Sequence, residues 1–260
     1  MPRDEEQIAA IIRVLKEENI PYYILGNGTN VIFKDEGYDG AIIRLLDNIN
    51  NVEINGTHIK AQAGIKLVRL ANAALEAGLS GLEFASGIPG SLGGAVTMNA
   101  GAYDGEMKDV LTLIKAMDKE GNIITFTPKE AELTYRHSIF SDGDYIIIEA
   151  EMELLEGSKA DIKAKMDDLN GRRRDKQPLE YPSCGSTFKR PEGYFAGKLI
   201  ADSGLSGARV GGASVSTKHC GFIINDQNGT AKDVLDLIEY VKKTVFEKQG
   251  VMLECEVRMI

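Results

Sequence analysis

The chain has 260 residues, a formal net charge of −9, and 43% hydrophobic and 27% charged residues, ordinary values for a globular protein long enough for two lobes. The acidic balance disfavours nucleic acid as a partner, because a phosphate backbone requires a broad basic face, and the apolar runs are too short to span a membrane. Three cysteines without close spacing argue against a disulfide framework and a zinc site, so we expect a cytoplasmic protein without a bound metal.

The first part of the chain reads as a helix followed by short strands. Residues 4–19 carry apolar side chains at helical spacing after Asp4, which suits an N-cap. Two apolar runs, residues 21–25 and 31–33, flank the glycine loop GNGTN at residues 26–30. Asn55 and Gly56 predict a hairpin turn, and residues 66–77 return to helical spacing before a glycine that suits a C-cap.

Residues 86–101, SGIPGSLGGAVTMNAG, contain five glycines and no charged side chain. Glycine allows a backbone to lie directly against an anionic ligand and to offer it N–H groups. The stretch therefore predicts either a tight structural loop or a nucleotide-binding loop. Neither this loop nor residues 26–30 match the Rossmann or P-loop fingerprints.

The second part of the chain alternates strand and helix patterns. We expect an antiparallel pair at residues 111–126, a short helix from Pro128, and a long strand that closes the first lobe near Leu155. Ser158 and Asp161 form the start of a helix that leads toward the second lobe. A striped helix spans residues 230–249, and residues 251–260 alternate as a final strand with two carboxylates and a guanidinium on one face.

Basic residues gather in one part of this acidic chain. Arg172, Arg173, Arg174 and Lys176 lie together, and Lys189 and Arg190 follow them in the sequence. The cluster suits a small polyanion, or it is a solvated helix end whose cations favour the helix C-terminus.

The three histidines, His58, His137 and His219, lie in no catalytic or metal-ligand motif. The spacing needed for a two-histidine metal site and the serine elbow of a hydrolase triad are both absent. We therefore interpret the histidines as structural.

Five segments, GNGTNVIF, SGIPGSLGGAVTMNAGAYDGE, TYRHSIF, PSCGSTFKRP and LECEVR, occur in an order and at separations that closely resemble the MurB family of UDP-N-acetylenolpyruvoylglucosamine reductases. The resemblance covers essentially the whole chain. It implies an α+β fold with a two-part FAD-binding domain of the vanillyl-alcohol-oxidase/PCMH type over residues 1–155, divided at about residue 45. A C-terminal α/β substrate-binding domain would occupy residues 156–260, with the last strand returning to the active site.

The resemblance also implies a non-covalently bound FAD, NADPH as hydride donor and a UDP-sugar substrate, acting in peptidoglycan synthesis. Both glycine loops would hold FAD and present N–H groups to its pyrophosphate. The cofactor-binding residues implied are Gly26, Asn27, Gly28, Thr29, Asn30, Val31, Ile32, Ser86, Gly87, Ile88, Pro89, Gly90, Ser91, Gly93, Gly94, Asn99, Ala100 and Gly101.

In this family NADPH reduces FAD, and the reduced flavin transfers a hydride to C3 of the enolpyruvyl group, which leaves an enolate that is protonated at C2. Ser186 falls on the position of the proton donor. Arg136 and Glu256 fall on residues that stabilise the enolate and its carboxylate. Since an ionised carboxylate would repel the enolate, we expect burial to keep Glu256 protonated when substrate is bound.

Four further positions are implied as substrate contacts. Lys176 aligns with a lysine of the family that meets the substrate, and Arg174 would face the diphosphate. Arg190 stands where many relatives have asparagine, so charge alone suggests its role, and Tyr135 is either a substrate contact or a packing residue.

The chain departs from the family pattern at its start. Relatives have several dozen residues before the position of Asp4, which leads us to expect weaker FAD binding; the tyrosine-bearing insertion is also absent, as in the shorter of the two family types. The leading hypothesis is a monomeric flavin reductase acting on a UDP-sugar. The alternatives are an FAD-dependent oxidase of the same fold and a flavin-free nucleotide-sugar-binding remnant.

Overall fold

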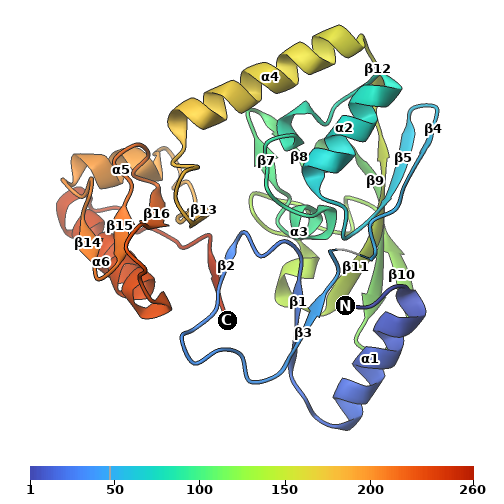
Figure 1. Cartoon of the computed structure of the whole chain (residues 1–260), viewed down its shortest axis with the longest axis horizontal. Helices are drawn as coiled ribbons and strands as arrows, with labels where there is room; N and C mark the ends of the chain where they lie inside the picture. Colours follow the sequence, from blue (N-terminus) through green and yellow to red (C-terminus); the bar gives the residue numbers. More distant parts are fainter. Residues whose placement is uncertain (47) are drawn as a thin grey trace. The chain divides into compact units, whose positions relative to one another are not determined.

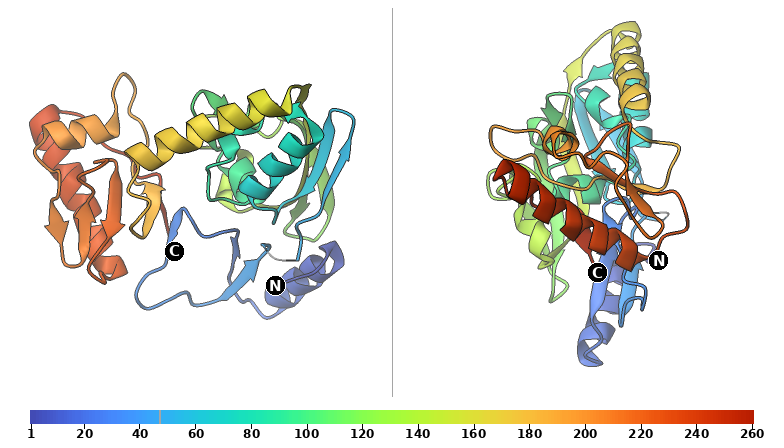
Figure 2. Two further views of the ribbon diagram at one scale, coloured as in Figure 1. Left: turned by 45° about the horizontal axis from the view of Figure 1, so that its top comes forward. Right: turned by 90° about the vertical axis from the view of Figure 1, so that its left-hand side faces the viewer.

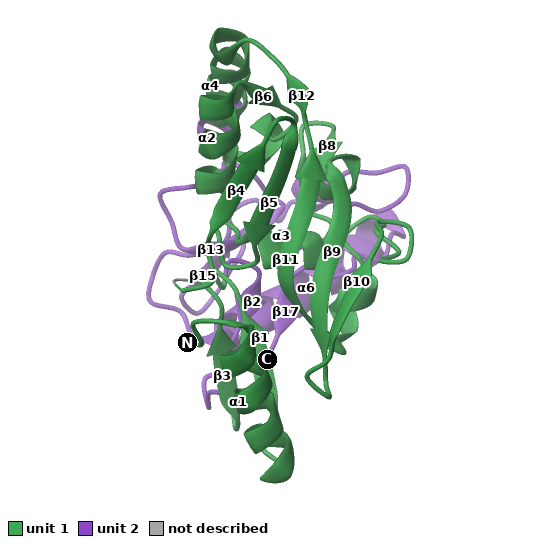
Figure 3. Cartoon of the chain, turned by 90° about the vertical axis from the view of Figure 1, so that its right-hand side faces the viewer, with its two compact units in different colours: residues 1–28, 39–171 green, residues 29–38, 172–260 purple. Residues whose placement is uncertain are grey.

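The computed structural model describes residues 1–46 and 48–260 (Figure 1). These residues form two compact units, one of residues 1–28 and 39–171 and the other of residues 29–38 and 172–260 (Figure 3). The division into domains at residue 155, expected from the sequence, stays a prediction. Within the described ranges, none of the helices combines the length and apolar character that a bilayer crossing needs.

The first unit is built on a five-stranded antiparallel sheet in the order β10-β9-β11-β5-β4. Strand β11 is buried on both faces. Ile146 and Ile148 join the core beneath helix α1, whereas Ile147 faces the core beneath α2 and α3. A register shift between residues 147 and 149 inserts one extra residue, so Ala150 and Met152 then face the second core. Alternation alone exposes the strand to both cores, and the bulge transfers the even-numbered residues after it from one core to the other.

The helices of the first unit begin and end where local sequence predicts. The side chain of Asp4 accepts a hydrogen bond from the N–H of Gln7, and Gly78 ends its helix in the left-handed conformation. The elements are α1 (Glu5–Glu17), β1 (Tyr22–Leu25), β3 (Ala41–Arg44), β4 (Val52–Asn55), β5 (His58–Gln62), α2 (Leu67–Ala77), β6 (Leu79–Ser80), η1 (Glu83–Ala85), α3 (Leu92–Thr97), β7 (Gly101–Ala102), β8 (Gly105–Glu106), η2 (Met107–Asp109), β9 (Leu111–Asp118), β10 (Ile123–Phe126), η3 (Ile139–Asp142), β11 (Tyr145–Glu153), β12 (Leu155–Glu156) and most of α4 (Lys159–Lys176).

The second unit is a four-stranded antiparallel sheet, in the order β13-β16-β15-β14, against which α6 packs (Figures 1 and 2). Thr230 and Asp233 form a capping box at the start of α6, and Asp35 accepts hydrogen bonds from two further N–H groups of its first turn, at 2.8 and 3.0 Å. The elements are β2 (Val31–Ile32), β13 (Ser183–Ser186), α5 (Ala196–Asp202), β14 (Arg209–Val210), β15 (Ala213–Val215), β16 (Phe222–Asn225), α6 (Ala231–Gln249) and β17 (Arg258–Met259).

Two expectations about secondary structure are wrong. Residues 251–260 do not form one strand: only β17 pairs with β2, and Cys255 makes an isolated bridge to Phe188. The expected helix from Pro128 is a single turn: Thr127 and Glu130 form a capping box at its start, but Glu132 has φ of 49°, a left-handed conformation that ends it. The alternating burial predicted for the last segment is present all the same, with Leu253 and Val257 in the core.

Gly64 provides a test of the packing in the first unit. It is buried, and an added Cβ would lie 1.6 Å from the carbonyl oxygen of Leu45 and 2.5 Å from that of Ile49. We expect Gly64→Ala to lower the free energy of unfolding by about 3 kcal/mol or more, because backbone oxygens cannot move aside as side chains do. Urea denaturation followed by circular dichroism measures the change.

The matched control is Gly143→Ala. Gly143 has φ of 79° and no atom within 4 Å of an added Cβ, so the left-handed backbone alone should cost roughly 1 kcal/mol. Equal losses for the two variants would contradict the packing argument.

Candidate functional site

Two glycine loops lie against each other in the first unit. Residues 26–28 follow β1, and residues 86–91 follow the 3₁₀ helix η1. A Cβ added to Gly26 would lie 2.3 Å from the Oγ of Ser91, and Asn27 Nδ2 donates a hydrogen bond to the carbonyl of Pro89 at 2.5 Å. A larger residue at position 26 would therefore displace the Ser91 hydroxyl, which accepts a hydrogen bond from the N–H of Gly94 at the start of α3.

The start of the second loop is fixed by the buried side chain of Glu83. Its carboxylate accepts hydrogen bonds from Ser80 Oγ at 2.6 Å and from the N–H of Gly81 at 2.9 Å. Burial alone would raise the pKa of Glu83, but these hydrogen bonds outweigh it and hold the pKa below the ordinary value. Ser86 Oγ donates to the carbonyl of Glu83 at 2.8 Å and accepts from Asn170 at 3.1 Å.

Some of the predicted ligand donors in the second loop are engaged by the protein itself. The N–H group of Gly93 donates to the carbonyl of Ala63 at 2.8 Å. The side chain of Asn99, 1% exposed, donates to Glu106 at 2.7 Å and to the carbonyl of Thr134 at 3.1 Å. Any role of Gly93 or Asn99 toward a ligand would thus be to shape the loop.

The two loops suit a dinucleotide diphosphate. Neither carries a charged side chain, and Gly28 has φ of 71°, a backbone that turns its amides without steric cost. Peptide N–H groups on such turns attract phosphate oxygens without a lysine. The close approach at Gly26 leaves the backbone, and not side chains, to face a bound anion, so these residues fit FAD.

Arg136 is held beside the end of the second loop. It has φ of 56° in a turn in which Thr134 and His137 pair, and its Nη2 donates to the carbonyl of Gly101 at 3.1 Å. Its guanidinium lies 5.3 Å from the centre of the Tyr135 ring, which is exposed. The structure therefore joins three predicted residues, Arg136, Tyr135 and Gly101, within the first unit.

Ser186 and Glu256 are brought near each other by pairing within the second unit. Ser186 ends β13 after Gly185, whose φ of 77° accompanies an irregularity between the pairs Ser183–Ile224 and Ser186–Phe222. Such bulges turn a side chain out of the regular alternation, and Ser186 is exposed. The N–H of Glu256 donates to the carbonyl of Thr187 at 2.8 Å, which places the main chains of both predicted residues side by side.

Asn30, at the end of the first loop, is hydrogen-bonded to the segment that contains Glu256. Its Nδ2 donates to the carbonyl of Glu256 at 3.1 Å, and β2 pairs in parallel with β17 directly afterwards. Asn30 therefore contributes to the second unit, whereas Gly26, Asn27 and Gly28 belong to the first.

Two residues distant in sequence, Lys218 and His219, lie at the cationic patch at the end of α4. Lys218 Nζ donates to the carbonyl of Arg174 at 2.8 Å, and His219 lies close enough to Lys176 for the charges to interact. Burial first, and then the positive charge of Lys176, lower the pKa of His219. Nδ1 of His219 accepts a hydrogen bond from the N–H of Gly221 at 3.2 Å. These positions are distant in sequence, and only the fold brings them together.

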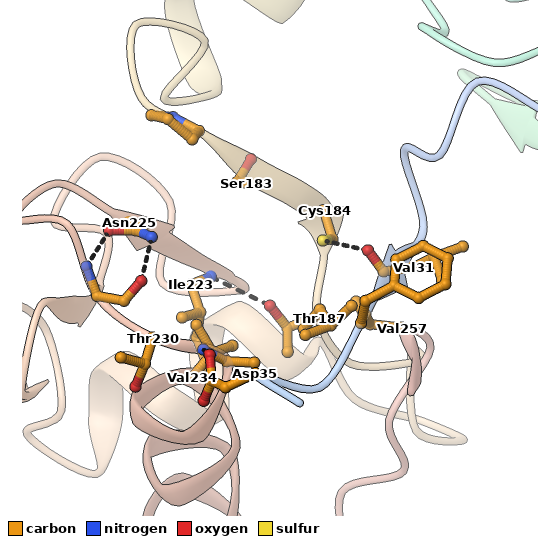
Figure 4. A pocket seen from close by; sticks show the side chains of 15 residues that line it. Val31, Asp35, Ser183, Cys184, Thr187, Ile223, Asn225, Thr230, Val234 and Val257 are labelled. Atoms are coloured by element: carbon orange, nitrogen blue, oxygen red, sulfur yellow. Dashed lines mark hydrogen bonds between the residues drawn. The ribbon is translucent and has the colours of Figure 1, made fainter. Parts of the chain in front are cut away.

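A pocket of about 370 Å³ also lies in the second unit (Figure 4). Its wall includes Val31 and Ile32 of β2, which follows the first glycine loop. It also includes Ser183, Cys184 and Thr187 around β13. Several of its polar groups already have partners: Thr187 Oγ1 accepts from the N–H of Ile223 at 3.1 Å, and the Asn225 amide bonds Gly229 twice. Ser186 and Glu256 do not line it, but their chain neighbours Thr187 and Val257 do.

Comparison with known families agrees with this arrangement. The family described as "FAD binding domain" matches residues 1–127, which contain both glycine loops. The family described as "UDP-N-acetylenolpyruvoylglucosamine reductase, C-terminal domain" matches residues 177–260, which contain Ser186 and Glu256. The chain is thus a flavin-binding module joined to a C-terminal module of this one class.

Individual relatives cover the whole chain. It is 53% identical over 259 residues to the UDP-N-acetylenolpyruvoylglucosamine reductase of Clostridioides difficile (strain 630) and 54% identical over 259 residues to that of Clostridium perfringens (strain 13 / Type A), in each case with 100% of this chain and 85% of the relative covered. The crystal structure of UDP-N-acetylenolpyruvylglucosamine reductase (MurB) from Thermus caldophilus matches with a TM-score of 0.85 at 36% identity, covering 99% of this chain and 90% of that one. The chain belongs to the MurB family, and the family and α+β fold expected from its sequence are confirmed.

The lowered pKa of His219 predicts a pH dependence of stability. The unfolded chain binds a proton at His219 more readily than the folded chain, so this residue's contribution to stability is complete above the unfolded pKa of about 6.5 and falls as the pH drops through that value toward the folded pKa. We expect His219→Gln to flatten the loss of stability between pH 7 and pH 5, measured as the urea midpoint at each pH.

His58→Gln serves as the control, because His58 is exposed on β5. If both variants kept the slope of the unmodified chain, burial of His219 would not be responsible for it.

Proposed function

We propose that the chain reduces UDP-N-acetylenolpyruvoylglucosamine to UDP-N-acetylmuramate with NADPH and bound FAD, as a step in peptidoglycan synthesis. The observation that carries the proposal is the 53% identity to a reductase of this name along the whole chain. Two features of the structure support it: the contact between the two glycine loops and the pairing that joins Ser186 to Glu256.

Residues 26–28 and 86–91 would hold FAD through their backbone amides. Bound FAD supplies the two-electron redox chemistry that no side chain can perform. The loops' own contacts fix their shape before a ligand arrives, so little ordering remains for binding to accomplish.

Ser186 would donate the proton to C2 of the substrate. A serine hydroxyl is a weak acid, so the reaction depends on the strong basicity of the enolate and on nearby positive charge. Lys189 lies three positions after Ser186, but its Nζ lies 3.2 Å from Glu254 Oε2, which compensates its charge in part. Arg136, anchored through Gly101, would bind the substrate carboxylate and the developing enolate by a charge-assisted fork.

The cationic patch would bind the nucleotide end of the substrate. Lys176 and Arg174 lie at the end of α4 and are exposed, and Arg190 is exposed beyond β13. Together they give an acidic protein a local site for a diphosphate. Tyr135 beside Arg136 would contact the substrate from the first unit.

We further propose that the protein acts in the cytoplasm as a monomer. Its three cysteines are free, as expected in a reducing compartment. Size-exclusion chromatography with light scattering would measure the mass in solution. A stable dimer would contradict the proposed monomeric state.

The activity itself has a direct test. Flavin-loaded protein should consume NADPH in a manner that depends on the enolpyruvyl UDP-sugar, followed at 340 nm. Flavin-loaded protein that consumes no NADPH with this substrate would refute the proposal, and rapid reoxidation in air with indifference to UDP-sugars would favour an oxidase.

The role of Ser186 can be separated from binding. Ser186→Ala should lower sugar-dependent turnover roughly 10²- to 10⁴-fold, the usual contribution of a positioned acid, while NADPH still bleaches the flavin at the normal rate. Stopped-flow absorbance measures both. A variant slowed equally in both reactions would indicate that Ser186 is structural.

Glu256 should act in its protonated form. Glu256→Gln keeps a hydrogen-bond donor of similar shape, whereas Glu256→Ala removes it, so we expect the glutamine variant to retain at least about tenfold more turnover. Equal activity of the two variants, measured under saturating NADPH, would argue that the carboxyl group does not donate.

A further inference from the structure

The guanidinium of Arg190 is held by the loop that follows it. Its Cζ lies 4.0 Å from the centre of the Phe195 ring, and its Nε donates a hydrogen bond to the carbonyl of Tyr194 at 3.3 Å. A stacked face and a hydrogen bond at the edge restrict a side chain that otherwise has many rotamers. The contacts orient Arg190 before any ligand binds.

The loop has a defined shape that produces these contacts. The N–H of Tyr194 donates to the carbonyl of Pro191 at 3.1 Å, and Gly193 has φ of 75°, so residues 191–194 form a tight turn. Phe195 follows as the N-cap residue of α5. The turn thus places a carbonyl and an aromatic ring around one guanidinium.

Phe195 is not needed for the hydrophobic core. Its side chain is 59% exposed, which is unusual for a phenylalanine in a globular protein. Lys189, the neighbouring cation, is paired with Glu254 at 3.2 Å. Phe195 is exposed and stacks on Arg190, whereas the charge of Lys189 is already paired. These contacts indicate that the ring holds Arg190 in place.

The location of Arg190 indicates which part of the substrate it meets. It follows Ser186 by four positions along a segment whose strand pairing continues to Phe188. At about 3.3 Å per extended residue, the two α-carbons are at most roughly 13 Å apart. Arg190 is thus displaced along the chain from the predicted proton donor, a location that suits an anion farther along the substrate.

We propose that Phe195 is a positioning residue, which holds the Arg190 guanidinium for the diphosphate of the UDP-sugar. This inference rests on the proposed function. A fixed planar fork can bind phosphate oxygens in a bidentate manner and loses less conformational entropy on binding than a mobile side chain does. Lysine at position 190 could not stack in this way.

Binding of UDP to the full chain, measured by isothermal titration calorimetry, tests the proposal. Phe195→Ala should weaken UDP binding roughly three- to tenfold, the range expected for loss of one cation–π contact, and Phe195→Trp should restore it. Phe246→Ala is the matched control, because Phe246 is 50% exposed on α6, and it should bind UDP normally.

A double-mutant cycle separates positioning from general structure. Arg190→Ala should weaken UDP binding about tenfold or more, as expected for a charged hydrogen bond, and Phe195→Ala should then add nothing. In turnover assays Phe195→Ala should raise KM for the UDP-sugar and leave kcat unchanged.

Normal UDP binding by Phe195→Ala, or an undiminished effect of this substitution in the Arg190→Ala background, would overturn the role of Phe195. Failure of the unmodified chain to bind UDP would instead contradict the proposed function itself, so the two failures are distinguishable.

Discussion

The contact between the two glycine loops is the constraint on which the rest of the first unit depends. The hydroxyl of Ser91 occupies the space that a side chain at position 26 would need, and Asn27 donates a hydrogen bond to the carbonyl of Pro89. Glu83 fixes the second loop from one end, and Arg136 binds its other end through Gly101. A flavin-binding surface and a predicted catalytic cation are therefore parts of one hydrogen-bonded frame, so a substitution in one would disturb the other.

The second unit positions its predicted catalytic residues by backbone pairing. Residues 187–189 pair with residues 254–256, which carries Ser186 and Glu256 to neighbouring main-chain positions although 70 residues separate them in sequence. Backbone hydrogen bonds do not depend on side-chain identity, so this placement tolerates substitution at most intervening positions. Only a few side chains on this paired backbone then determine the chemistry of the site.

Sequence predicted the features that local interactions determine. The helices after Asp4, Lys66, Ser158 and Thr230 form as expected because caps and apolar stripes act within a few residues. The expected strand over residues 251–260 is wrong because strand length depends on a partner, and only β2 and Phe188 provide one among the described residues. Likewise Lys218 and His219 could not be assigned to the cationic patch, since nothing local connects them to Lys176; the family motifs, not spacing, indicated Ser186, Arg136 and Glu256.

The parallel pairing of β2 with β17 has a consequence for how the chain acquires its structure. Val31 pairs with Arg258, so these partners are 227 positions apart. Closing so long a loop is slow, and contacts of this kind form late in folding. During synthesis, β2 gains its strand partner only after the last strand has been made. Asn30 would accordingly reach its final hydrogen bond only in the last stage of folding, and a chain stalled short of its C-terminus would leave this end of the loop without an anchor.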